Sequence, residues 1–131
     1  MLFVYGTLRK GCPHPMALRL ANEADYHGPA SASGQLYRIV DYPGFVPASE
    51  GRVQGDLFRL FQADETLAWL DDYEECAPHF PTPQEYRRER LMVDGPCGAV
   101  EAWTYVYAPP VENLVQIEGG DFLACTSKDG G

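Results

Sequence analysis

The sequence predicts an α+β protein: a small, closed or nearly closed β-sheet with two helices packed against it. Its 131 residues and 45% hydrophobic content suit one domain with a single core. Eleven prolines and thirteen glycines divide the chain into segments that are mostly of strand length. These segments do not alternate regularly with helices, which argues against a doubly wound parallel sheet.

Five segments are expected to form strands, the last two on their many aromatic and β-branched residues: 1–5, 33–40, 52–60, 85–95 and 98–108. Pro43-Gly44 is a turn signal, so we expect a turn between the second and third of them. Pro96 and Gly98 mark the connection between the last two. After Pro109 the chain has one apolar segment, residues 113–117.

Two segments are expected to form helices. The first starts at Pro15, because proline is tolerated at the first helical position, where its missing N–H costs least. Its apolar face would consist of Met16, Ala17, Leu20, Ala21 and Ala24. The second covers residues 63–76, with Asp64 as its N-cap, and the proline-containing stretch APHFPTP ends it.

Charge and composition exclude several classes of partner. Ten basic residues against nineteen acidic ones give a net charge of −9, which would repel nucleic acid and anionic membrane surfaces. No signal peptide and no run of about 20 apolar residues is visible. The four cysteines form no CxxC pair, so we interpret them as reduced thiols. We therefore expect a single cytoplasmic domain over residues 1–131, with a disordered tail from about residue 124.

Several kinds of catalytic site can be set aside. No serine lies in a GxSxG context, which excludes a hydrolase nucleophile elbow. The first turn, YGTLRKG, lacks the second glycine-lysine-serine/threonine of a phosphate-binding loop. The histidines share no metal-ligand spacing, and Cys12 with His14 supplies only two ligands. We predict neither a metal nor a cofactor.

Glu74 stands out among the many carboxylates of the second helix. At about 100° per residue, Leu67, Leu70 and Glu74 form one stripe, while Asp72 and Glu65 point the other way. A glutamate on the buried stripe would have a raised pKa, as a general base and acid requires. Two structural alternatives remain: the helix frays before residue 74, or Glu74 pairs with Arg87 or Arg88.

The first turn offers a complementary feature. Gly6 follows the strand that ends at Tyr5, and it permits either a positive φ or a close approach of the backbone to another group. The N–H groups after it could converge on an anion or a developing oxyanion. An ordinary glycine at the end of a strand is the alternative.

Five short motifs follow one another in chain order and form a combined pattern: FVYGTLRKG (3–11), LDDYEE (70–75), YRRERLMV (86–93), AWTYVY (102–107) and GGDF (119–122). With YPGFVP and VQGDLFRL between them, they resemble the γ-glutamylcyclotransferase-like, or AIG2-like, family over nearly the whole chain. The chain departs from the family pattern in three places, of which one is the long loop CAPHFPTPQE after Glu75. Glu75 stands where the family usually has glycine, and GCPHP replaces the usual continuation after the first turn.

The resemblance implies a mixed β-barrel-like sheet with two or three flanking helices, and a reaction that needs no metal or cofactor. It places Glu74 on the family's catalytic glutamate. A small γ-glutamyl substrate would bind near the backbone of four residues of the first turn: Tyr5, Gly6, Thr7 and Leu8. Tyr86 would hydrogen-bond the substrate or Glu74, or serve only as a barrel aromatic. The products would be 5-oxoproline and a free amine.

Two other functions fit the same residues. The enzyme could remove a γ-glutamyl group from a larger metabolite with the same machinery. Alternatively, the scaffold could be a non-catalytic module that binds small molecules, because a fold does not fix a function. No oligomeric state and no macromolecular partner is predicted.

Overall fold

The structure is a computed structural model that describes residues 1–6, 8–9, 14–39, 43–74, 84–112, 114–117 and 120. Its helices and strands are β1 (Leu2–Val4), α1 (Pro15–Glu23), β2 (Ala24–Arg38), β3 (Pro43–Leu60), α2 (Ala63–Tyr73), β4 (Tyr86–Gly95), β5 (Gly98–Tyr107) and β6 (Val115–Gln116). Within the described part of the chain, no helix has both the length and the apolar composition that crossing a bilayer requires.

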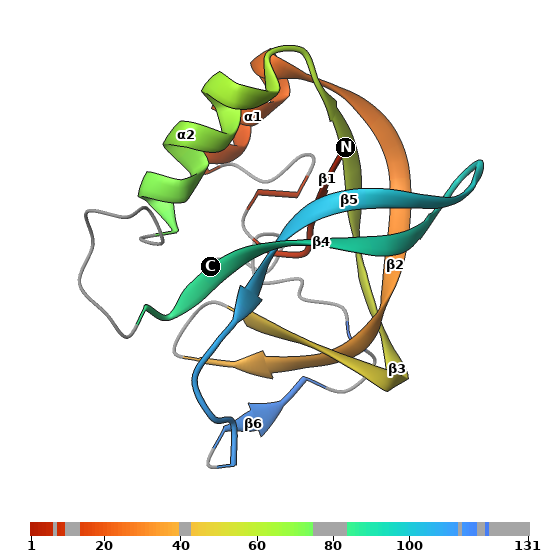
Figure 1. Ribbon diagram of the computed structural model, residues 1–131, viewed down its shortest axis with the longest axis vertical. Coiled ribbons are helices and arrows are strands. Elements are labelled where there is room, and N and C mark those ends of the chain that lie inside the picture. The colour runs from red at the N-terminus through yellow and green to blue at the C-terminus, as the bar shows by residue number, and fades with distance from the viewer. Residues whose placement is uncertain are drawn as a thin grey trace.

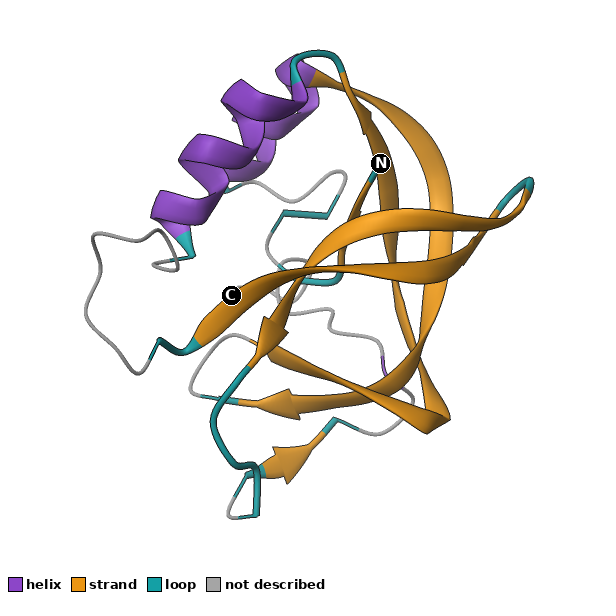
Figure 2. Ribbon diagram, viewed as in Figure 1, coloured by secondary structure: helices purple, strands orange, loops and turns teal. Residues whose placement is uncertain are grey.

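The sheet closes on itself. Its strand order is β3-β1-β5-β4-β2-β6, and β2 also pairs with β3, so β1 to β5 form a ring (Figure 1). β1 runs parallel to β5, and the other pairings are antiparallel, so the sheet is mixed. Both helices lie together on one side of this barrel (Figure 2). The predicted α+β class and closed sheet are confirmed.

The long β2–β3 hairpin curves around the barrel because its register shifts twice, between Tyr26 and Gly28 and between Ser33 and Gly34. Such bulges bend a strand and increase its twist. Gly28 has a φ of +115°, and a Cβ there would lie 2.6 Å from Cγ of Pro96 in the β4–β5 turn. A side chain at position 28 would therefore be both strained and obstructed.

Two sequence predictions about this hairpin are wrong. Pro43-Gly44 is not a turn: the two residues begin β3 and pair with Arg38 and Tyr37. β2 also begins at Ala24, well before the predicted start at residue 33. Its first half is rich in small and polar residues. The small ones, such as Ala30 and Ala32, face the crowded barrel interior. Only packing, not β-propensity, identifies that half as a strand.

The helix ends differ in part from the prediction. α1 begins at Pro15 as expected, and the side chain of the preceding His14 accepts a 3.1 Å hydrogen bond from the Met16 N–H. Ala17 and Leu20 are buried, whereas Ala21 is exposed.

In α2 the N-cap is Gln62 rather than Asp64, and its side chain makes no capping bond. Asp64 instead lies in the first turn, where a carboxylate is still favourable at the positive end of the helix dipole. The prediction carried this helix to residue 76, whereas α2 ends at Tyr73. Residues 75 and 76 are outside the described residues, as is the tail from 124.

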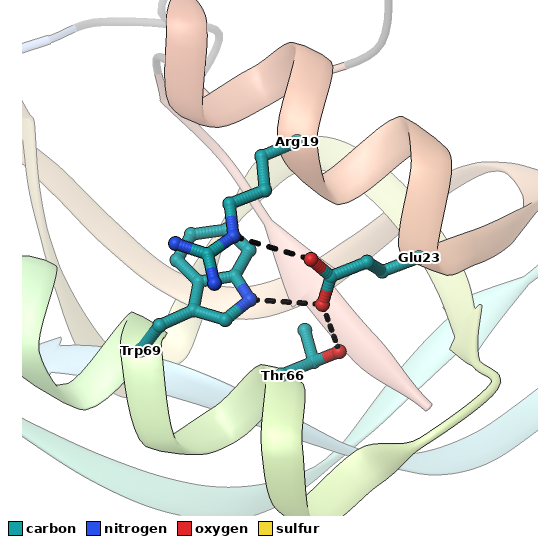
Figure 3. A network of polar contacts seen from close by, with 4 residues as sticks. All are labelled: Arg19, Glu23, Thr66 and Trp69. Atoms are coloured by element: carbon teal, nitrogen blue, oxygen red, sulfur yellow. Dashed lines mark hydrogen bonds and ion pairs between the residues drawn. The ribbon is translucent and has the colours of Figure 1, made fainter.

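A polar cluster joins the two helices (Figure 3). The Glu23 carboxylate of α1 accepts hydrogen bonds from the Trp69 indole at 2.9 Å and the Thr66 hydroxyl at 2.7 Å, both on α2. Arg19 donates to the other carboxylate oxygen at 3.1 Å and stacks over the Trp69 ring. These bonds lower the pKa of Glu23. They connect Thr66 and Trp69 of α2 to α1.

Two apolar layers hold the fold together. The barrel core fills the ring and consists of Phe3, Tyr5, Ala30, Ala32, Leu36, Phe45, Val53, Leu57, Val93, Ala102 and Val106. The helix layer, between barrel and helices, consists of Leu2, Val4, Leu8, Leu20, Ala24, Phe58, Leu67, Leu70, Tyr86, Tyr105 and Tyr107. Burial of these side chains supplies most of the driving force for folding.

Leu70→Ala tests the packing of α2 on the barrel. Leu70 is fully buried in the helix layer, so its truncation should lower the free energy of unfolding by about 2–5 kcal/mol. Leu18→Ala, on the exposed face of α1, is the matched control and should change it by less than about 0.5 kcal/mol. Urea unfolding followed by circular dichroism measures both, and equal effects would contradict this packing.

Candidate active site

Glu74 lies at the end of α2, directly after its last helical residue, Tyr73. Its N–H still donates to the Leu70 carbonyl at 2.8 Å, so the helical path continues to residue 74. Leu67 and Leu70 are buried in the helix layer, and Glu74 is partly buried. The side chain thus continues the buried stripe, as the helical periodicity predicts, and fraying before residue 74 is not observed.

The Glu74 carboxyl has no counter-ion among the described residues. Burial, with a smaller contribution from the negative charge of Glu85, raises the pKa of Glu74 to about 7. Among the described residues, no side chain forms a hydrogen bond or ion pair with this carboxylate; Arg88 pairs with Asp71, and Arg87 with Glu89. An arginine partner would have lowered the pKa. The structural ion pair considered for Glu74 is therefore not present in the described structure.

The first turn follows β1 and is built around Gly6. Thr7 lies outside the described residues, but the Arg9 N–H donates to the Gly6 carbonyl at 3.1 Å and closes the turn. The φ of Gly6 is not positive. Instead, a Cβ at this position would lie 3.0 Å from Cγ of Pro43, so glycine is needed for close approach of the start of β3.

The Leu8 side chain lies in the apolar core. It is 5% exposed and packs in the helix layer together with Leu67 and Leu70. It therefore contributes to the site only through its backbone. The same contact places the first turn against the helix that carries Glu74.

Tyr5 connects the first turn to the barrel. Its hydroxyl donates to the Tyr105 carbonyl at 2.5 Å and accepts from the Phe45 N–H at 3.3 Å. Burial and the negative charge of Glu74 raise the pKa of Tyr5 well above its ordinary value, so the phenol stays neutral. The fold thus brings Glu74 close enough to Tyr5 for its charge to act on the phenol, although 69 positions separate them in the sequence.

Tyr86 is a barrel aromatic that supports the turn. It is buried, packs edge-to-face on Tyr107, and its hydroxyl donates to the Pro43 carbonyl at 2.6 Å. The ring of Pro43 in turn contacts Gly6. The described structure shows no hydrogen bond between Tyr86 and Glu74, one of the two hydrogen bonds considered from the sequence. Tyr86 instead fixes the residue against which Gly6 packs.

Two polar clusters beside the site were not predicted. At the end of the first turn, Arg9 Nε lies 3.3 Å from Asp56 Oδ2, and the Tyr26 hydroxyl donates to Asp56 Oδ1 at 3.1 Å. Asp56 is 5% exposed and lies in the buried run GDLF, next to Leu57 and Phe58. A carboxylate in such a run is a sequence signal for a buried pair, because an unpaired buried charge is strongly unfavourable.

The second cluster lies on the last turn of α2. Asp71 Oδ1 accepts from Arg88 Nε at 2.9 Å and from the Tyr105 hydroxyl at 2.7 Å, and Asp71 Oδ2 accepts from Arg88 at 3.2 Å. The Arg88 guanidinium also stacks over the Trp103 ring, 4.5 Å from its centroid. This cluster joins α2 to both β4 and β5. Its members are far apart in the sequence, which gives no signal of their pairing.

The described residues contain no group of three or more histidine, cysteine or acidic side chains able to hold a metal ion. His14 is the N-cap of α1, and its proposed companion Cys12 lies outside the described residues. The arrangement around Glu74 combines a carboxyl that titrates near neutrality with the backbone of a tight turn. Such a pair can move a proton and stabilise a developing negative charge.

Comparison with known proteins shows the family to which the chain is related. Residues 2–124 match the model of the family described as gamma-glutamyl cyclotransferase, AIG2-like. The chain is 38% identical to the gamma-glutamylcyclotransferase family protein YtfP of Escherichia coli K12, over 93% of this chain and 95% of the relative. It is 31% identical to a bovine protein named gamma-glutamylaminecyclotransferase, over 83% of this chain and 67% of that protein.

The solved structures agree as well. The solution structure of E. coli YtfP superimposes with a TM-score of 0.63, at 37% identity, and covers 93% of this chain and 95% of that one. An AIG2-like protein from mouse gives a TM-score of 0.64 at 28% identity, over 82% and 78% of the two chains. These matches show the same fold along nearly the whole chain. The chain therefore belongs to the AIG2-like gamma-glutamyl cyclotransferase family.

Proposed function

We propose that the protein is a γ-glutamylcyclotransferase-type enzyme that cleaves a γ-glutamyl amine or peptide into 5-oxoproline and a free amine. The observation that carries the proposal is the Glu74 carboxyl, which has a pKa of about 7, no described counter-ion, and a position beside Tyr5 and the first turn. Membership of the family and the name of the bovine relative support the same reaction. We expect it to proceed in the cytoplasm without a metal or cofactor.

The reaction begins with a proton transfer. Glu74, as a carboxylate, takes a proton from the α-ammonium of the substrate, and the freed amine attacks the γ-carbonyl carbon within the same molecule. A C–N bond forms, and the carbonyl electron pair moves onto oxygen. Because nucleophile and electrophile belong to one substrate held in one geometry, much of the entropic cost of bringing them together is avoided.

The resulting oxyanion needs donors already in place. The N–H groups of Gly6, Thr7 and Leu8 are our candidates, because the side chain of Leu8 is turned into the helix layer and Gly6 has none. Fixed backbone dipoles stabilise such a charge without reorganising during the reaction. The Tyr5 hydroxyl is already engaged with Tyr105 and Phe45, so Tyr5 serves the site through its backbone and by fixing the turn.

The last step breaks the original amide bond. The oxyanion collapses, the bond from the γ-carbon to the leaving nitrogen breaks, and protonated Glu74 returns its proton to that nitrogen. In total, two protons pass from the attacking nitrogen to the departing one, which leaves as an ammonium ion, and Glu74 carries them one at a time. A pKa near the working pH suits a group that must both accept and donate a proton.

Glu74→Gln should reduce release of 5-oxoproline by about 10²–10⁴-fold, the usual contribution of a general acid–base, and leave the circular dichroism spectrum unchanged. The assay is chromatography of 5-oxoproline from a panel of γ-glutamyl amines and peptides. Glu75→Gln, one residue further on, is the matched control and should retain activity. Equal loss in both variants would refute the assignment of the base, and no release by the unmodified protein from any substrate would favour the binding module.

The pH dependence of kcat/KM should follow the Glu74 carboxyl. The base form is the carboxylate, so activity should rise with pH and reach half of its maximum near pH 7, the pKa of Glu74. Initial rates measured from pH 4.5 to 9 give this acid limb. A limb centred near pH 4.5, the ordinary value for a glutamate, would show that the base is not an enclosed carboxyl.

Glu74→Gln should also stabilise the protein at alkaline pH. The folded-state pKa of Glu74 is raised from 4.5 to about 7, so the folded state favours the protonated carboxyl. The stability that this protonated form contributes is complete below pH 4.5 and is lost as pH rises through 7. Glutamine mimics the protonated form at every pH. The variant should match the unmodified protein at pH 4 and exceed it at pH 8 by up to about 3 kcal/mol in urea unfolding. Equal stability at pH 8 would contradict the burial of a carboxylate.

A further inference from the structure

We propose that Asp71 is a positioning residue for Glu74: through Arg88 and Tyr105 it fixes the last turn of α2, so that the Glu74 carboxylate stays enclosed beside Tyr5. This inference rests on the proposed function and extends it to a residue that does not touch the substrate. Among the described residues no side chain holds the Glu74 carboxylate, and Glu74 follows directly on the last turn of α2.

The last turn of α2 is electrostatically unfavourable on its own. Asp71, Asp72 and Glu74 all lie at the negative end of the helix dipole, and the turn has no basic residue. Negative charges there promote fraying. The compensating cation, Arg88, comes from β4 and binds Asp71 through both of its carboxylate oxygens. Such two-point pairs fix orientation as well as distance.

This ion pair is well placed to hold a geometry. The Asp71 side chain is 19% exposed and the Arg88 side chain 27%. The guanidinium plane is fixed by the Trp103 ring, on whose π-system Arg90 also stacks. Arg88 therefore presents its donors in one orientation. Partial burial also makes the pair less sensitive to screening than the surface pairs of the chain.

Tyr105 links the cluster around Asp71 to Tyr5 and the first turn. Its hydroxyl donates to Asp71 at 2.7 Å, and its backbone carbonyl accepts from the Tyr5 hydroxyl at 2.5 Å. One residue of β5 thus binds both the last turn of α2 and the residue before Gly6. Asp71 precedes Glu74 by three positions, within one helical turn. The cluster sets the distance between the base and the first turn.

Loss of the Asp71 charge should affect Glu74 in one direction. Titratable or charged groups approach the end of α2 from the neighbouring elements: Tyr5 after β1, His14 before α1 (against Tyr73), Glu85 before β4, Arg88 in β4, and Tyr105 and Tyr107 in β5. Without Asp71, the turn loosens and Glu74 gains water, a nearby negative charge disappears, and Arg88 is released. Each change favours the carboxylate and lowers the pKa of Glu74.

The test compares Asp71→Asn with Glu23→Gln. Glu23 also accepts three hydrogen bonds, but it binds α2 at Thr66 and Trp69, ahead of the last turn, so its substitution controls for a general weakening of the helix. The readouts are kcat and KM for 5-oxoproline release, and a ¹³C NMR titration of the Glu74 carboxyl, assigned by its absence in Glu74→Gln. Tyr105→Phe is a milder second variant that keeps the ring and the backbone carbonyl.

Asp71→Asn should lower kcat by about 10- to 100-fold with little change in KM, as expected for a displacement of about 1 Å at the base. The Glu74 titration should move from about 7 toward 4.5, and Tyr105→Phe should move it less in the same direction. Glu23→Gln should lower the melting temperature while the titration stays near 7.

The proposal is overturned if Asp71→Asn leaves the titration and kcat unchanged, or if Glu23→Gln shifts both as much. If Asp71→Asn fails to fold, the comparison of Tyr105→Phe with Glu23→Gln, by the same kinetics and NMR titration, decides the proposal. The NMR titration needs no substrate. If the unmodified protein releases no 5-oxoproline but Asp71→Asn alone shifts Glu74, the proposed function fails while the positioning of Glu74 stands.

Discussion

The packing of α2 against the barrel is the constraint on which the rest of the site depends. Leu67 and Leu70 place the helix on the apolar layer formed with Leu8 and the aromatic residues of β4 and β5. This contact is non-directional, so by itself it would leave the helix free to slide or rotate. Directional bonds remove that freedom: Glu23 binds Thr66 and Trp69 of α2, and Arg88 and Tyr105 bind Asp71 in its last turn. The position of Glu74 follows from the two together.

The enclosed carboxyl at the end of α2 lowers the stability of the fold whenever it is ionised. Enclosure of Glu74 without a described partner makes its ionised form unfavourable, and the nearby Glu85 adds to that effect. The fold tolerates the cost because the surrounding groups are satisfied. The Tyr5 hydroxyl has both a donor and an acceptor, and the Tyr86 hydroxyl is bound to the Pro43 carbonyl. Rigid neighbours keep the carboxyl from turning to water.

The sequence predicted much of the fold, and the parts it missed have identifiable causes. β4 and β5 were predicted closely, since their aromatic and branched residues reflect a half-buried strand pair. The first half of β2 was missed because the barrel interior selects small residues such as Ala30 and Ala32, which carry no strand signal. Pro43 was taken for a turn residue, but it begins a strand, a position where a missing N–H is tolerated.

For the site, the sequence by itself determined that Glu74 continues the buried stripe of a helix, because helical periodicity is a local property. It left open whether Gly6 is needed for a positive φ or for close backbone approach, and the contact with Pro43 in the structure shows close approach. Only the tertiary structure decided that Arg88 pairs with Asp71 rather than Glu74, that Tyr86 binds Pro43, and that Glu74 lies beside Tyr5. Those contacts depend on closure of the sheet and on the docking of α2, and the physical reason is that residues distant in the chain become neighbours only when the whole core has formed.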